Sequence, residues 1–181
     1  MNIFRLDDDP LQAAVYQCDK HVVKMCLETA QLLSTTHHVL DGDEASTILY
    51  KATHKNHPSA IWARENSANY LWLLDHFDGL LSEYQYRYGK HHACNRLMPV
   101  LQFLPKNITH NTEETPFRLA MPEQYHNDDP VKAYRDYYWH EKRYMATWPF
   151  DREPTWWSEY LRGGVNIRSK EERDYVILAA Q

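Results

Sequence analysis

The chain has 181 residues, of which 43% are hydrophobic and 25% charged, a composition typical of a globular protein that buries a substantial core. No apolar run approaches the roughly 18–20 residues of a membrane-spanning helix, and the N-terminus lacks the apolar core of a signal peptide. The net charge of −5 argues against a protein whose main task is to coat nucleic acid, although a small basic cleft on an acidic body is compatible with it.

The first quarter of the chain predicts a short arm and a long helix. Residues 1–8 predict an extended arm, and a helix is predicted over residues 10–36. Asp9 is a candidate N-cap and Pro10 occupies the first helical position, a combination that starts helices. Apolar side chains then recur at helical spacing with no further Gly or Pro, which predicts a broad apolar face. The segment 37–43 predicts a turn.

The middle of the chain predicts a second long helix. A short helix or an irregular stretch is expected over residues 44–53. The second long helix is predicted over residues 58–87, with apolar positions at helical spacing and Gly89 as its stop signal. A shorter helix is predicted over residues 91–104, with an interruption near Pro99.

The last third predicts a long loop followed by helices. Residues 105–128 contain three prolines with several Asn and Thr, which indicates an ordered loop long enough to be functional. Asp129 repeats the cap-plus-proline start, here for a helix over residues 130–147. A short segment over residues 152–164 and a capped helix over residues 170–180 complete the chain.

Alternating strand patterns are absent, so the sequence predicts an all-α fold. Residues 1–181 are expected to form a single-domain helical bundle. It would have two long N-terminal helices and a long loop before the C-terminal helices.

One face of the first long helix carries polar side chains among core residues. His21, Lys24, Glu28, Gln31 and Thr35 follow at steps of three and four residues and therefore form one row. The row is either a solvated face with a Lys24–Glu28 pair or a functional row that lines a cleft, and its mix of short and long polar types favours the cleft. In that case Glu28 is the candidate acid–base group, Lys24 a candidate nucleophilic amine and His21 a third catalytic candidate.

The second long helix also carries polar residues on one face. Trp62, Asn66 and Asn69 share this face, and Asn is a poor residue for a helix interior. The two amides either form buried hydrogen bonds between helices or recognise a base or a phosphate. All three residues are candidates for substrate binding, together with Gln31 and His57.

Aromatic and basic residues mix in the last third of the chain. Arg118 lies in the long loop, and Trp156 and Trp157 follow Pro154. Such residues can stack bases and hold phosphates, so these three are further candidates for substrate binding. The alternative is an aromatic core packed around the long loop.

The sequence predicts neither a metal site nor a cofactor. Its histidines form three clusters: His37-His38, His54-x-x-His57 and His91-His92-x-Cys94. None has the spacing of a zinc site, so surface or capping histidines are expected. The chain has no Gly-rich phosphate loop, Rossmann fingerprint or nucleophile elbow. Three cysteines outside any zinc spacing predict reduced thiols in a cytoplasmic protein.

Three short motifs resemble one family of small phage proteins. They are Asp19-Lys20-His21 followed by Glu28, Asn56-His57-Pro58 with Trp62, and Arg152-Glu153-Pro154-Thr155-Trp156-Trp157. Together they resemble the bacteriophage pyrimidine-dimer DNA glycosylases, which are small, all-helical glycosylase/AP lyases. The resemblance implies DNA as the partner and the cytoplasm of an infected host cell as the location.

The resemblance also implies a mechanism. In the family, the α-amine of the processed N-terminus attacks the sugar C1′, and a glutamate assists ring opening and elimination through the resulting imine. The matching carboxylate here is Glu28. Asn2 follows Met1, and Met is usually retained before Asn, so the amine would belong to Met1 or the role would pass to Lys24.

The acidic net charge leaves two other functions open. One is an enzyme that modifies a pyrimidine base or nucleotide without binding DNA, and the other is a non-enzymatic phage accessory or binding protein. The oligomeric state is not indicated by the sequence. For the enzyme, we expect Glu28 in a cleft with His21 or Lys24 and at least one of Trp62, Asn66 and Asn69.

Overall fold

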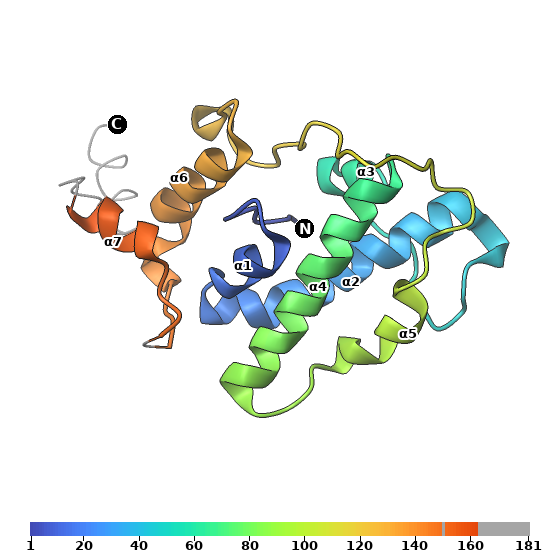
Figure 1. Ribbon diagram of the computed structural model, residues 1–181, viewed down its shortest axis with the longest axis horizontal. Helices are drawn as coiled ribbons and strands as arrows, with labels where there is room; N and C mark the ends of the chain where they lie inside the picture. Colours follow the sequence, from blue (N-terminus) through green and yellow to red (C-terminus); the bar gives the residue numbers. More distant parts are fainter. Residues whose placement is uncertain (150, 163–181) are drawn as a thin grey trace, which may run out of the picture.

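The computed structural model describes residues 1–149 and 151–162, which form α-helices joined by 3-10 turns and loops (Figure 1). No strand occurs within these ranges, and the predicted all-α fold is confirmed. No described helix is long and apolar enough to cross a membrane. The predicted helix over residues 170–180 and the glycine pair that ends the preceding segment lie outside the described residues.

The first predicted long helix is two helices, α1 (Pro10–Val15) and α2 (Asp19–Asp41), so the unbroken helix over residues 10–36 was wrong. Tertiary hydrogen bonds stabilise the break between them. The Cys18 N–H donates to the Tyr138 hydroxyl at 2.9 Å, and Arg87 donates to the carbonyl oxygens of Val15 and Gln17, each at 2.9 Å. These partners are remote in sequence, so the local pattern does not reveal the break.

The end of α2 also differs from the prediction. The helix continues through most of the predicted turn over residues 37–43 and stops at Gly42, whose φ of 56° is left-handed. The continuation is stabilised by burial, since His37 is 6% exposed and its ring nitrogen is 2.8 Å from the Tyr70 hydroxyl.

The second predicted long helix is likewise two helices, α3 (Pro58–Ala63) and α4 (Ser67–Tyr88), so the unbroken helix over residues 58–87 was wrong. The break is visible in the sequence as Asn66, whose side chain accepts the N–H of Asn69 at 2.9 Å and caps α4. Gly89 ends α4 at φ 67°, as predicted.

The remaining elements are shorter than predicted. In chain order they are 3-10 turns at Gly42–Glu44 and Ala93–Leu97, α5 (Met98–Leu101), a 3-10 turn at Glu123–Tyr125, α6 (Pro130–Lys142), a 3-10 turn at Arg143–Met145, and α7 (Thr155–Arg162). Residues 45–53 have no helix, and the predicted helix over 91–104 is a 3-10 turn followed by a single α-turn.

The core forms where α4 packs against α1 and α2 (Figure 1). Gly79 in α4 allows close approach to α1, since a Cβ atom added there would lie 2.9 Å from the Cβ of Ala14. Large aromatic side chains fill the remaining space, and six of those in the described residues are fully buried: Trp62, Trp139, Tyr70, Tyr134, Tyr138 and Phe77.

The N-terminal arm has no helix, as predicted, but it is buried. Ile3 and Leu6 are 1% and 0% exposed. The Arg5 guanidinium lies 4.7 Å from the ring centroid of Trp72 and 5.2 Å from that of Phe117, distances at which cation–π attraction is significant. In Figure 1 the N-terminus accordingly lies near the middle of the molecule.

The long loop over residues 105–122 crosses α3 and the start of α4 on its way to α6 (Figure 1). The Asn69 amide donates to the Thr115 hydroxyl at 2.7 Å and accepts the Thr115 N–H at 2.9 Å. The Asn66 amide donates to the Glu113 carbonyl at 3.0 Å. Of the two alternatives for these asparagines, the structure therefore shows buried hydrogen bonding, which holds the loop in place.

Candidate functional site

Two primary amines flank one carboxylate at the start of the chain. The N-terminal nitrogen of Met1 lies 3.6 Å from Oε2 of Glu28, and Nζ of Lys24 lies 3.2 Å from Oε1. The Asn2 N–H also donates to Oε2 at 3.2 Å. The Glu28 side chain is 14% exposed and that of Lys24 is 65% exposed, so the carboxylate is sheltered while one of its amines extends into water.

Helix periodicity and the buried arm bring these groups together. Lys24 and Glu28 are four residues apart on α2 and therefore lie on the same face. Met1 reaches this face because the following residues, from Ile3 to Leu6, are anchored in the core. The Lys24–Glu28 pair is thus local, whereas the position of the N-terminal amine is set by tertiary packing.

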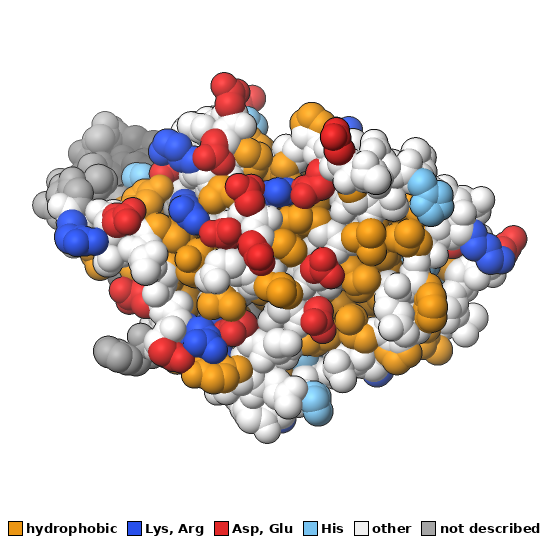
Figure 2. All heavy atoms as spheres, in the orientation of Figure 1, with side chains coloured by type: hydrophobic (Ala, Val, Ile, Leu, Met, Phe, Trp, Pro, Cys, Tyr) orange, Lys and Arg blue, Asp and Glu red, His pale blue; other side chains and the backbone are white. Residues whose placement is uncertain are grey.

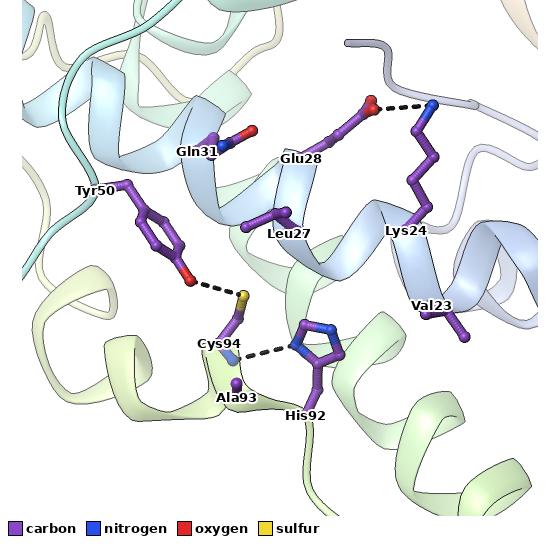
Figure 3. A pocket seen from close by; sticks show the side chains of 9 residues that line it. All are labelled: Val23, Lys24, Leu27, Glu28, Gln31, Tyr50, His92, Ala93 and Cys94. Carbon is purple, nitrogen blue, oxygen red and sulfur yellow. Dashed lines mark hydrogen bonds and ion pairs between the residues drawn. The ribbon is translucent and has the colours of Figure 1, made fainter.

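A pocket of about 510 Å³ adjoins this carboxylate (Figure 3). One wall belongs to α2, and the other to Tyr50 and to the start of the 3-10 turn Ala93–Leu97. The lining residues are Val23, Lys24, Leu27, Glu28, Gln31, Tyr50, His92, Ala93 and Cys94. Figure 3 shows the Glu28 and Lys24 side chains turned toward each other on one side of Leu27, with Tyr50 and Cys94 on its other side. The volume of the pocket is typical of a site that binds a small molecule.

Sequence reasoning missed the second wall of the pocket. The Tyr50 hydroxyl lies 3.5 Å from Sγ of Cys94, and the Cys94 N–H donates to Nδ1 of His92 at 3.1 Å. His92 and Cys94 fall in the predicted helix over residues 91–104 and Tyr50 in a stretch with no predicted role, and the only signal for a site was the His91-His92-x-Cys94 cluster. In the described part of the chain, no three His, Cys, Asp or Glu side chains are placed to hold a metal ion.

His57 lies within electrostatic range of the paired amine and carboxylate. It caps α3, and its Nδ1 accepts the Ser59 N–H at 3.2 Å. The neutral ring therefore carries its proton on Nε2. Burial lowers the pKa of His57, the N-terminal amine and His54 lower it further, and Glu28 raises it.

Thr35, the last residue of the polar row, holds the segment that leads to His57. Its hydroxyl donates to the Thr53 carbonyl at 3.2 Å and accepts the Thr53 N–H at 3.1 Å. His54 follows at φ 48°, a left-handed conformation that is uncommon outside glycine. The polar row on α2 thus contributes side chains that line the pocket, and its last member, Thr35, forms hydrogen bonds that hold the neighbouring segment in place.

His21 lies apart from the pocket. Its ring stacks on Phe4 of the arm, with centroids 4.5 Å apart, and meets the edge of Tyr138 at 5.1 Å. Burial lowers its pKa to about 3, with smaller contributions from Lys142 and Lys24. As a catalytic residue His21 stays a prediction, and the packing favours a neutral core ring under the arm.

Replacement of His21 by Phe is expected to weaken the pH dependence of stability. A native pKa near 3 against about 6.5 in the unfolded chain means that the unfolded state binds the extra proton. The contribution of the neutral His21 ring to the free energy of unfolding is therefore complete above pH ~6.5. It is lost as the pH falls toward 3, by up to about 1.4 kcal/mol per pH unit. Urea unfolding of both proteins from pH 7 to pH 4 measures it, and parallel curves would contradict the expectation.

The other substrate-binding candidates do not line the pocket. Trp62, Asn66 and Asn69 are buried and hold the long loop, so none of them joins Glu28 in this pocket, contrary to expectation. Arg118 is paired with Glu65 at 2.5 Å and its side chain is 47% exposed.

Trp156 and Trp157 are 4% and 5% exposed. Their rings pack edge to face against Tyr16 and Trp139 respectively. The two rings are thus core residues, as in the aromatic-core alternative, but these partners lie at the end of α1 and in α6 and not in the long loop. Base stacking by these rings stays a prediction that the packing does not favour.

The fold and site define a small, all-helical protein with two amines around one carboxylate at the edge of a pocket. Residues 1–96 match the model of a family described as pyrimidine dimer DNA glycosylase, and this match covers more than half of the chain. The chain belongs to the pyrimidine dimer DNA glycosylase family. No curated protein and no solved structure matches it.

Proposed function

We propose that the chain is a DNA glycosylase with lyase activity that acts on a pyrimidine base in DNA, in which Glu28 is the acid–base group and the amine of residue 1 the nucleophile. The observation that carries this proposal is the 3.6 Å approach of that amine to the Glu28 carboxylate. An amine next to a sheltered carboxylate has a proton acceptor within reach, which activates it for attack on carbon. Membership of the pyrimidine dimer DNA glycosylase family agrees with such a substrate.

The proposed reaction has two stages. First, the amine nitrogen bonds to C1′ of the sugar while the bond from C1′ to the base breaks, and the base leaves with the bonding electrons and takes up a proton. Glu28 takes up the amine proton and passes it to O4′ as the C1′–O4′ bond breaks, which opens the sugar ring, leaves a protonated imine and restores the carboxylate. Second, Glu28 removes a proton from C2′, and the C3′–O bond breaks to release the phosphate. Glu28 thus accepts protons in both stages.

The pocket beside Glu28 offers room for a nucleotide withdrawn from the duplex. Enzymes that act on a base in DNA commonly extrude it from the stack. Leu27, Ala93 and Tyr50 provide apolar surface, while Gln31 and Glu28 provide polar groups. We propose Gln31 and His57 as substrate-binding residues. Gln31 lines the pocket, and His57 lies close enough to Glu28 for the carboxylate to influence its pKa.

Charge distribution limits where DNA can bind. Acidic side chains gather across the middle of the face shown in Figure 2. Asp75 belongs to the acidic residues of α4, and its pKa is raised by burial and by Asp78 and Asp9. Such a face repels phosphates. We therefore propose that DNA approaches the exposed side of α2, where Lys20 and Lys24 are both exposed. Residues 1–181 would act as one domain.

Borohydride trapping tests the proposal. With an oligonucleotide that carries a cyclobutane pyrimidine dimer, the imine is expected to be reduced to a stable adduct that peptide mass spectrometry assigns to residue 1. Trapping should persist in Lys24→Ala and in the control Lys106→Ala, which removes an exposed surface lysine outside the site, and should be lost after selective acetylation of the α-amine. The reverse pattern would assign the nucleophile to Lys24.

Other results would support the alternatives. Turnover without any adduct would indicate water as the nucleophile. Release of base from a free pyrimidine nucleotide, but not from DNA, would favour the nucleotide-modifying enzyme. If the protein gave no adduct, no turnover and no DNA binding at low salt, where phosphate contacts are strongest, the proposed function would be refuted and the binding-protein alternative would stand.

A further inference from the structure

We propose that Tyr134 is a positioning residue, which acts through a closed hydrogen-bond cycle with Asn2 and Ala120 to hold the amine of residue 1 against Glu28. The proposal rests on the proposed function of that amine. It assigns a positioning role to the second half of the chain, because Ala120 and Tyr134 lie outside residues 1–96, which match the family.

The cycle has three members, each of which donates one hydrogen bond and accepts one. The Asn2 side-chain amide donates to the Ala120 carbonyl at 3.0 Å. The Ala120 N–H donates to the Tyr134 hydroxyl at 3.2 Å, and that hydroxyl donates to Oδ1 of Asn2 at 2.8 Å. The directions are mutually consistent, so all three bonds form together.

Burial fixes the direction of the cycle. Tyr134 is fully buried in α6, and burial raises its pKa, so the hydroxyl keeps its proton and can donate. A buried hydroxyl that loses its acceptor pays a desolvation penalty. Tyr134 therefore favours the one position of Asn2 in which Oδ1 receives its proton.

The cycle acts on the first two residues of the arm, where Oδ1 of Asn2 also accepts the Ile3 N–H at 2.8 Å. Ile3 and Phe4 are 1% and 5% exposed, and they hold the arm from its third residue onward. Asn2 precedes them, and its own N–H donates to Oε2 of Glu28 at 3.2 Å. A shift of Asn2 therefore moves both the main-chain contact with Glu28 and the neighbouring amine, at 3.6 Å from the same oxygen.

The long loop connects this cycle to the core. Ala120 ends the segment that Thr115 fastens to Asn69 of α4, and Tyr134 stands on the helix that follows the loop. The loop is thus fixed to α4 at Thr115 and continues into α6, and between these two points Ala120 lies next to Asn2. The buried asparagines of α4 contribute to the site through this path and not by contact with the pocket.

The test removes one hydroxyl and compares two buried tyrosines. Tyr134→Phe deletes the cycle, while Tyr70→Phe deletes an equally buried hydroxyl that donates to the Leu101 carbonyl at 2.8 Å. Both should lose similar stability. Tyr134→Phe alone is expected to lower the single-turnover rate of imine trapping by roughly 10- to 100-fold, with KM unchanged, because a misplaced nucleophile affects the chemical step and not binding.

A second readout needs no catalysis. The Met1 side chain is 3% exposed, so its methyl group gives an NMR signal typical of a buried methionine in protein labelled at the five methionine methyls. In Tyr134→Phe this signal should move toward the position of an exposed methionine, whereas in Tyr70→Phe it should stay. If the wild type never traps DNA, the proposed function fails, but this signal still decides whether Tyr134 holds the arm.

A variant on the arm guards against misfolding of the core. Asn2→Leu keeps the size of the side chain and removes its polar atoms, and intact mass confirms that Met1 is retained. It should reproduce both effects of Tyr134→Phe, and the double variant should be no worse than either single one, as expected for members of one network. Unchanged trapping and an unchanged Met1 signal in both single variants would overturn the proposal.

Discussion

Glu28→Gln is expected to reduce the rate of imine trapping by about 10²–10⁴-fold, the usual contribution of a positioned acid–base group. The amide has nearly the shape of the carboxylate but cannot accept a proton. The ion pairs of Glu28 that the variant loses involve an exposed lysine and the chain terminus. The unfolding free energy should therefore fall by only about 1 kcal/mol, and the thermal midpoint by about 2–4 °C. Single-turnover kinetics and thermal unfolding measure the two effects.

Glu44→Gln provides the matched control for this prediction. Glu44 pairs with Lys106 at 2.5 Å on the surface, and its side chain is 63% exposed. Its replacement removes the same charge and should leave trapping unchanged. Full activity in Glu28→Gln would remove Glu28 from the mechanism. A large drop in both variants would indicate that net charge, and thus DNA binding, is the cause.

Arg87→Met is expected to cost about 3–5 kcal/mol of unfolding free energy, because it removes one partner of a buried ion pair. The Arg87 side chain is 1% exposed and pairs with Glu83, itself 8% exposed, at 2.9 Å. It also donates to the carbonyl oxygens of Val15 and Gln17 at the break between α1 and α2. The variant leaves these acceptors without their donor, and Glu83 keeps only the ion pair with Arg152, at 3.2 Å.

Denaturant unfolding measures this loss, with Arg118→Met as the control. Arg118 makes a comparable pair with Glu65, but its side chain is 47% exposed, so its replacement should cost less than about 1 kcal/mol. Equal losses in the two variants would contradict the role of Arg87 at the break. A larger loss in Arg87→Met would support the view that a remote side chain stabilises the separation of the two helices.

The sequence by itself determined the helical fold and part of the site. Helical periodicity, the Asp9 and Asp129 caps and the stop at Gly89 are local signals, and the structure follows them. The spacing of Lys24 and Glu28 placed both side chains on one face of a helix, because four residues make about one turn. The extended arm was also predicted, and so was the long loop, from its three prolines with several Asn and Thr.

Only the tertiary structure decided how these parts meet. The break after Val15 depends on Tyr138 and Arg87, and the position of the N-terminal amine depends on burial of Ile3 and Phe4. Periodicity identifies the residues of a buried face but not the element that covers it. Trp156 and Trp157 therefore look equally suited to a core and to base stacking until packing buries them. Tyr50 enters the pocket from an irregular segment and Cys94 from a 3-10 turn, and long-range contacts rather than local preference bring the two together.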